Sequence, residues 1–177
     1  MSIAATEQSQ PLIPADRKAI VAAHPAIANS ARWFWWIAGL SLVNSVMIHS
    51  GSERTFLAGL GFTLMADALF HTFKPAAFLF DALGIGFFVV IGLMALRGYR
   101  WAFMVGGIFY ALDAVIYLCL QAFLPLAFHG WALFSIWTGG MALNRAIKEY
   151  QSTPRQPTPP LLPTTTTAPS SLEPPPL

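Results

Sequence analysis

Three aspartates and two histidines lie inside or beside long apolar stretches of the chain, where ionisable side chains are costly. They are Asp67, His71, Asp81, Asp113 and His129. Such residues within membrane-length segments are rare, pair with other polar groups and often mark an ion, proton or ligand site. Asp67 and His71 are four residues apart, so on a helix they share one face. We therefore treat these five residues as a candidate ion, proton or ligand cluster.

Three kinds of chemistry would use this cluster. Carboxylates and imidazoles bind Zn, Fe or Mn, as in a membrane metalloenzyme, although bundle metal sites typically use Glu and the chain has none between Glu53 and Glu149. The same groups relay protons or hold a coupling cation in transporters. Alternatively, each Asp bonds a neighbouring helix and fixes its packing. The partners considered for that role are Asn44, Thr63, Tyr110, Tyr117 and a Trp N–H group.

Several function classes are disfavoured by composition and motifs. The net charge is only +2, and Lys and Arg stand at the ends of apolar segments, which argues against nucleic-acid binding. The single cysteine, Cys119, allows neither an intramolecular disulfide nor a cysteine metal cluster. The sequence has no nucleophile elbow, no phosphate-binding loop and no His-Glu-x-x-His motif. We therefore favour a non-enzymatic protein and assign no catalytic residue, metal ligand or cofactor.

The elements that must position the cluster are apolar and helical. The chain is 55% hydrophobic and only 10% charged, against about 25% charged in a soluble domain. Its apolar segments are 33–49, 55–73, 76–96, 101–123 and 126–143. Because the connections are short, consecutive helices must be antiparallel neighbours. The sequence predicts an all-α, integral membrane, up-and-down bundle of four to five transmembrane helices.

The second segment decides between four and five crossings. Asp67 opposes insertion there by about 2.5–3.5 kcal/mol, nearly cancelling the contribution of its Leu and Phe residues. A re-entrant second segment also places eight of the ten Lys and Arg on one side. Against this, Thr55–Phe73 is long enough to cross and contains no proline. We expect five crossings, with four as the alternative and the orientation left open.

The depth of each residue indicates whether the cluster can assemble. At 1.5 Å per residue, a five-crossing bundle displaces all five candidates toward the same membrane face. If the second segment is re-entrant, only Asp81, Asp113 and His129 keep that relation. The pairs Ala82/Gly86 and Ala102/Gly106, with Gly139-Gly140, are expected to let helices approach closely.

The ends of the chain differ from its centre. Residues 1–30 are expected to be a flexible segment with a short interfacial helix from Asp16 to Ala23, N-capped by Asp16 and stopped by Pro25. The bundle is expected over 31–147. Residues 148–177 are expected to form a disordered tail, because the last 27 residues contain nine Pro and six Thr.

The helix starts carry a further pattern. Arg32 is followed by Trp33-Phe34-Trp35-Trp36 and, later in the same segment, by Asn44-Ser45. In the second segment, Gly59-Leu60-Gly61 is followed by Asp67-Ala68. In the fourth, Trp101-Ala102-Phe103 is followed by Tyr110 and Asp113. Over roughly 31–144, this pattern resembles a group of small uncharacterised bacterial multi-pass membrane proteins. The resemblance implies a bacterial inner membrane but no reaction or cofactor.

The function expected from these observations is that of a membrane component. We expect an accessory or interaction protein whose partners are the lipid bilayer and either another membrane protein or further copies of itself. The alternatives are a proton- or cation-coupled transporter or channel-like module, and a membrane metalloenzyme.

Overall fold

A computed structural model describes residues 12–50, 60–70 and 72–153, apart from the side chains of His49 and Asp67. Every regular element in these residues is an α-helix, which confirms the predicted all-α class. The helices are α1 (Pro14–Ala23), α2 (Pro25–His49), α3 (Gly61–Leu69), α4 (Lys74–Leu96), α5 (Arg100–Cys119) and α6 (Phe123–Ser152).

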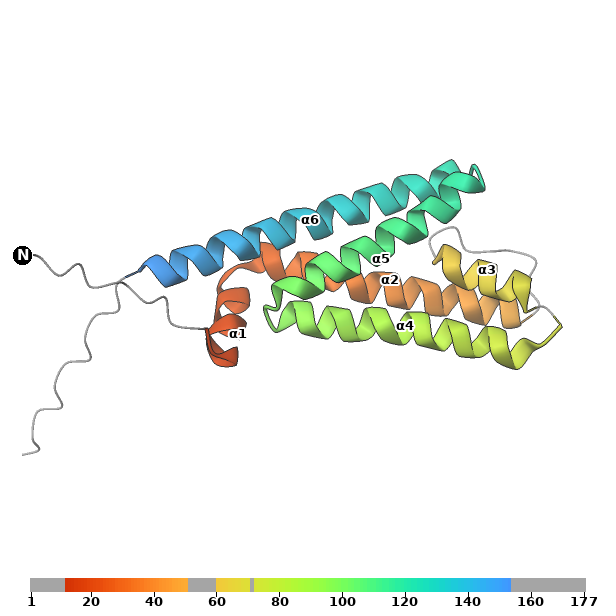
Figure 1. The fold of residues 1–177 in the computed structure, drawn as a ribbon, viewed down its shortest axis with the longest axis horizontal. Coiled ribbons are helices and arrows are strands. Elements are labelled where there is room, and N and C mark those ends of the chain that lie inside the picture. The colour runs from red at the N-terminus through yellow and green to blue at the C-terminus, as the bar shows by residue number, and fades with distance from the viewer. Residues whose placement is uncertain (1–11, 51–59, 71, 154–177) are drawn as a thin grey trace, which may run out of the picture.

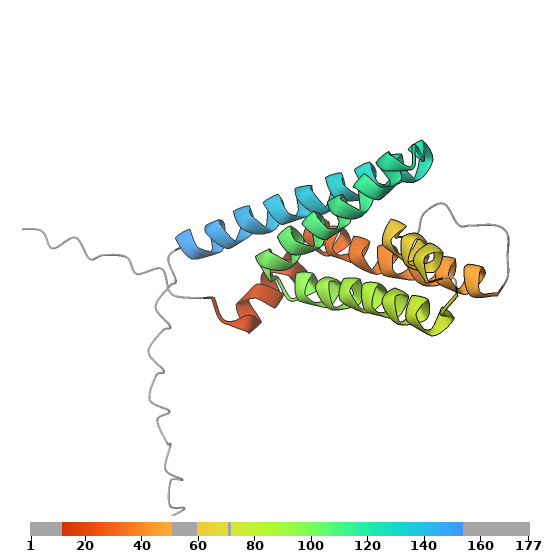
Figure 2. The same cartoon turned by 45° about the vertical axis from the view of Figure 1, so that its right-hand side comes forward.

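The four long helices of the described chain, α2, α4, α5 and α6, lie along one axis and alternate in direction (Figure 1). α2 packs mainly on α4 and α6, and α5 packs mainly on α6. α1 lies at the end of the bundle where α6 finishes, and α3 lies at the other end against α4 and α5 (Figures 1 and 2). We call these the α1 end and the α3 end.

The helix expected over Thr55–Phe73 is contradicted at Leu60 and Phe70, which are not helical, while residues 55–59 lie outside the described residues. The helix in this region has 9 residues, Gly61–Leu69, so it is about 13 Å long, less than half of a hydrocarbon core. It begins only at Gly61, because the preceding Leu60 has extended backbone angles, and it ends at Phe70, which leaves the helical region. The described helix of the second segment is therefore too short to be the fifth membrane-crossing helix that the sequence argument required.

Aromatic rings and small residues form the bundle centre. Phe34 is fully buried, and its ring centroid lies 6.3 Å from that of Phe88 and 6.1 Å from that of Phe103. A Cβ atom added at Gly106 would lie 2.5 Å from the Phe34 ring. The predicted close approach at Ala102 and Gly106 is thus confirmed, because both are buried.

The other predicted small-residue contacts have mixed outcomes. Gly139 packs against Ser30 of α2, which confirms close packing there. The packing role predicted for Ala82 and Gly86 is wrong, because both are exposed and no atom lies within 4 Å of an added Gly86 Cβ. These two residues occupy the outward side of α4, where a small side chain meets no described helix.

The amino-terminal helix is present but starts earlier than expected. α1 begins at Pro14 with Ile13 as its N-cap, so Asp16 lies in the first turn and is not the cap. Ile20 and Val21 are buried, and the Arg17 guanidinium lies 5.5 Å from the centre of the Tyr99 ring. Pro25 begins α2 and does not merely stop α1. Residues 154–177, most of the predicted tail, lie outside the described residues.

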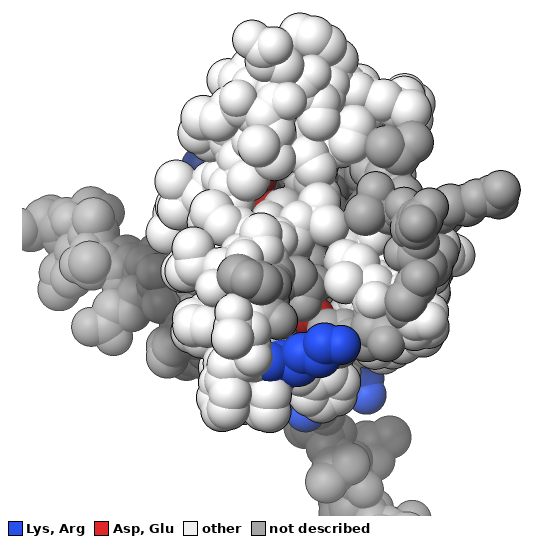
Figure 3. All heavy atoms as spheres, turned by 90° about the vertical axis from the view of Figure 1, so that its right-hand side faces the viewer, with Lys and Arg blue, Asp and Glu red and all other residues white. Residues whose placement is uncertain are grey.

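The outward faces of the long helices are apolar. Large hydrophobic residues are exposed along α2, α4, α5 and α6, including Leu42, Leu83, Ile108 and Phe134. In the end view of Figure 3, the described surface is mostly uncharged, with small areas of Lys or Arg and of Asp or Glu. Two helices, α4 and α5, are long and apolar enough to cross a membrane.

Candidate functional site

Asp113 binds the start of α3 through both carboxylate oxygens. The backbone N–H of Gly61 donates to Oδ2 at 2.9 Å, and the N–H of Phe62 donates to Oδ1 at 2.8 Å. The first N–H groups of a helix have no partner within the helix, and their partial positive charge attracts an anion. Asp113 of α5 therefore caps α3 from a different helix.

The local sequence of α3 explains why it needs this external cap. Its N-cap residue is Leu60, whose side chain makes no capping hydrogen bond. The Leu60 N–H instead donates to Ser41 Oγ of α2 at 3.1 Å, and the Ser41 hydroxyl donates to the Ile37 carbonyl. Two buried side chains from other helices thus satisfy three consecutive N–H groups at the start of α3.

Gly61 allows this close approach. A Cβ atom added at Gly61 would lie 3.0 Å from the Tyr117 ring and 3.3 Å from Ile116, both on α5. A larger residue at this position would require the Tyr117 and Ile116 side chains to shift. Thr63 closes the turn, because its hydroxyl donates to the Leu60 carbonyl at 2.7 Å.

His129 of α6 completes the surroundings of Asp113. Its Nε2 lies 2.9 Å from Asp113 Oδ2, and its Nδ1 lies 2.8 Å from the Pro125 carbonyl oxygen. Because a carbonyl oxygen only accepts hydrogen bonds, Nδ1 carries a hydrogen. One proton then lies between Nε2 and Oδ2, in an ion pair or in a neutral acid–imidazole pair. Asp113 therefore joins α3, α5 and α6.

Two tyrosine rings enclose the His129 imidazole. The Tyr110 ring stacks on it with centroids 4.3 Å apart and planes 15° apart, and the Tyr117 centroid lies at 4.9 Å. His129 is fully buried, and Asp113 is 5% exposed. Among the described residues, no group bonds the buried Tyr110 hydroxyl.

Asp81 forms a separate polar contact. It is buried on α4, and the Ser45 hydroxyl of α2 donates to its Oδ2. Asn44, beside Ser45 in the sequence, is also fully buried. The Ser45–Asp81 hydrogen bond joins α2 to α4, which is the kind of contact expected if a buried Asp fixes helix packing.

Of the predicted cluster, the structure shows Asp113 and His129 in direct contact, and Asp81 accepting a hydrogen bond from Ser45. The side chain of Asp67, and His71 entirely, lie outside the described residues. Within the part of the chain that is described, no three His, Cys, Asp or Glu side chains gather as a metal site would require.

An apolar groove of about 390 Å³ opens between α3, α4 and α5, and Asp113 forms part of its wall. Aromatic residues dominate the remaining wall, including Phe62, Phe80, Phe87 and Phe109.

Ser41 is a site residue that the sequence analysis missed. The available signal was the start of α3 itself, because a helix that opens with Leu60-Gly61 lacks the usual Ser, Thr, Asp or Asn cap. A buried helix start without its own cap requires polar side chains from elsewhere in the fold.

The chain matches no protein-family model, and comparisons with curated proteins and with solved structures found no significant match.

Proposed function

We propose that this protein is a small, non-enzymatic, multi-pass membrane component that crosses the bilayer four times, through α2, α4, α5 and α6. Two observations support membrane insertion: α4 and α5 have suitable length and hydropathy, and all four helices expose large apolar side chains. In water, an apolar surface this extensive would drive aggregation.

The lower hydropathy of α2 is compatible with a crossing. α2 has 25 residues, or about 37 Å at 1.5 Å per residue, which is enough for a hydrocarbon core of about 30 Å. Its polar residues Ser41, Asn44 and Ser45 are buried among the other helices. They would therefore be shielded from lipid. α6 has 30 residues, and His129 is likewise buried on it.

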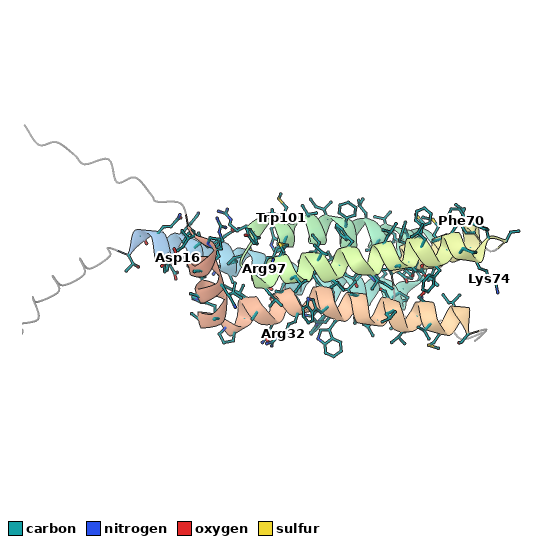
Figure 4. The ribbon with its side chains drawn as sticks, turned by 90° about the horizontal axis from the view of Figure 1, so that it is seen from below. Asp16, Arg32, Phe70, Lys74, Arg97 and Trp101 are labelled. Atoms are coloured by element: carbon teal, nitrogen blue, oxygen red, sulfur yellow. The ribbon has the colours of Figure 1, made fainter. Side chains whose placement is uncertain are left out.

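The charges support one orientation. Of the described Lys and Arg residues, Lys74 lies at the α3 end (Figure 4), and the others belong to α1, the start of α2, the α4–α5 turn and the last turns of α6. Cytoplasmic loops are enriched in Lys and Arg. We therefore place the α1 end in the cytoplasm, with a bacterial inner membrane as the proposed location.

The observation that carries the non-enzymatic proposal is the hydrogen bonding of Asp113. Two backbone N–H groups and one imidazole nitrogen already occupy this carboxylate. Irregular backbone within a membrane is tolerated only where protein satisfies its polar groups. Asp113 and Ser41 provide this for a short helix that does not span, so the buried acid has a structural purpose without any substrate.

The remaining surface would then serve association. With the polar groups directed inward and apolar side chains outward, the bundle presents lipid-facing surfaces to which another membrane protein or a second copy could bind. We propose an accessory or interaction role on this basis.

A proton-handling role is the second candidate function. It is favoured by the proton shared between Asp113 and His129, and by the stacked Tyr110 ring. In that role, the pair would exchange its proton with the groove between α3, α4 and α5.

Proton flux into liposomes distinguishes these two functions. The purified protein is reconstituted, and a pH-sensitive dye inside the vesicles reports flux under an imposed potential. The accessory role predicts the same flux as in protein-free liposomes, for the wild type and for Asp113→Asn alike. A flux that Asp113→Asn abolishes while the helical circular dichroism spectrum stays unchanged would support the transporter and overturn the accessory role.

A further inference from the structure

A second groove runs between α5 and α6 and has a volume of about 560 Å³, within the usual range of about 300–1,000 Å³ for ligand sites. Its wall includes Arg100, Gly107 and Ala111 of α5, and Trp137, Met141 and Asn144 of α6. It does not include Asp113, His129 or any residue of α3.

The polar residues of this groove are confined to one end. Arg100 and Asn144 lie at the α1 end, and the wall from Met104 to Ala111 is apolar. From Arg100 to Ala111 the groove extends eleven residues along α5, or roughly 16 Å. That length is about half of a hydrocarbon core, so the groove has the depth of one lipid leaflet.

The two polar residues at this end have unused bonding capacity. Arg100 is exposed, and within the described chain no carboxylate pairs with its guanidinium. The Asn144 side-chain oxygen is buried, and within the described chain no group donates to it. An exposed cation at one end of an apolar groove matches a lipid with an anionic headgroup and an acyl chain.

We propose that this groove binds an anionic glycerophospholipid of the cytoplasmic leaflet, with phosphatidylglycerol as the probe. The phosphate lies on the exposed Arg100 guanidinium, and one acyl chain fills the apolar groove past Gly107 to Ala111. This inference rests on the proposed membrane topology, because the α1 end must face the anionic leaflet.

Native mass spectrometry of the delipidated full-length protein in detergent tests this site, by titration with phosphatidylglycerol or phosphatidylcholine. We expect one phosphatidylglycerol to bind at least fivefold more tightly than phosphatidylcholine. Arg100→Gln should weaken that binding about tenfold, because it removes a charge-assisted hydrogen bond to the phosphate. Gly107→Leu should fill the groove and remove the site for both lipids, and Ala111→Leu is a second blocking variant should Gly107→Leu not fold.

Matched controls separate this site from general effects. Arg97→Gln removes a charge at the same end, and Gly86→Leu adds the same side chain on the open side of α4, where an added Cβ meets no atom within 4 Å. Both controls should bind within twofold of the wild type. Free glycerol phosphate should not compete, because it lacks the acyl chain.

Several results would overturn the lipid site. The first is equal binding of the two lipids by the wild type, and the second is unchanged binding by Arg100→Gln. The third is full competition by glycerol phosphate. The fourth is a wild-type dimer that dissociates in Gly107→Leu while lipid binding persists. If alkaline carbonate releases the native protein from membranes, the proposed function fails together with the lipid site. A protein that stays integral but shows no lipid preference contradicts the lipid site alone.

Discussion

At the scale of single residues, Asp113 shows how a chain keeps an acid within an apolar bundle. An ionisable side chain at membrane depth carries a substantial free-energy cost. Here, two backbone N–H groups and His129 offset that cost by bonding to the carboxylate. Hydrogen bonds to charged groups contribute about 1.5–3 kcal/mol each in soluble proteins, although bonds between membrane helices average less.

Two substitutions of His129 distinguish the effect of its hydrogen bond on stability from the effect of its side-chain volume. His129→Leu leaves Asp113 without its partner on α6, so we expect the free energy of unfolding to fall by about 1–2 kcal/mol. His129→Gln keeps an N–H donor, and its loss should be smaller than about 1 kcal/mol. Unfolding in detergent, followed by circular dichroism, measures both. A His129→Leu protein as stable as the wild type would show that this bond contributes nothing to the fold.

At the scale of elements, α3 shows what the sequence can and cannot predict. Apolar runs bounded by charges or prolines located the four long helices, but α2 begins at Pro25 and not at Trp33, and α6 ends at Ser152 and not at Leu143. The same reasoning predicted too long a helix at α3. Asp113 caps α3 at Gly61 from 52 residues away in the sequence, and hydropathy contains no information about such a contact. The alternative of a re-entrant second segment rested on Asp67 and on the charge bias. Only that alternative agrees with the short helix.

The candidate site was predictable in its residue types but not in its pairings. Asp113 and His129 were identified because ionisable groups are rare in apolar segments. Their contact depends on how α5 packs on α6, and the contact of Asp81 with Ser45 depends on how α4 packs on α2. Those arrangements follow from side-chain shape at buried positions such as Gly139 and Gly106, which periodicity does not encode.

Close helix packing leads to a second prediction, at Gly139. A methyl group there would overlap Ser30 of α2, so Gly139→Ala should lower the free energy of unfolding by about 1–3 kcal/mol. Gly86→Ala is the matched control, because an added Cβ meets no atom within 4 Å, and the better helix former should add up to about 1 kcal/mol. Thermal unfolding of both variants measures the difference. Equal stabilities would contradict the packing of α6 on α2.

At the scale of the whole molecule, the fold places its two described ends on one side. α1 and the last turns of α6 lie at the same end of the bundle, and Lys74 lies at the other (Figures 1 and 4). An even number of crossings gives this arrangement.

Cysteine labelling tests the number of crossings. In a Cys119→Ser background, Ser50→Cys marks the end of α2 and Ser152→Cys marks the end of α6. Four crossings place these residues on opposite sides, whereas five crossings place them on the same side. We expect a membrane-impermeant maleimide to label Ser50→Cys in intact cells, and Ser152→Cys only after permeabilisation. Labelling of both from one side would contradict four crossings.

The measurement that tests the structural role of the buried acids most directly is the thermal stability of Asp113→Asn in detergent, compared with Asp81→Asn and with metal content determined on the same samples. An Asn at 113 has one acceptor oxygen, and its NH₂ group would face an N–H donor, so we expect a loss of about 1–3 kcal/mol. Asp81→Asn should lose less, because its carbonyl can still accept the Ser45 hydroxyl. If Asp113→Asn is as stable as the wild type or more so, the acid is kept at a cost to stability, and ion, proton or metal chemistry becomes its function.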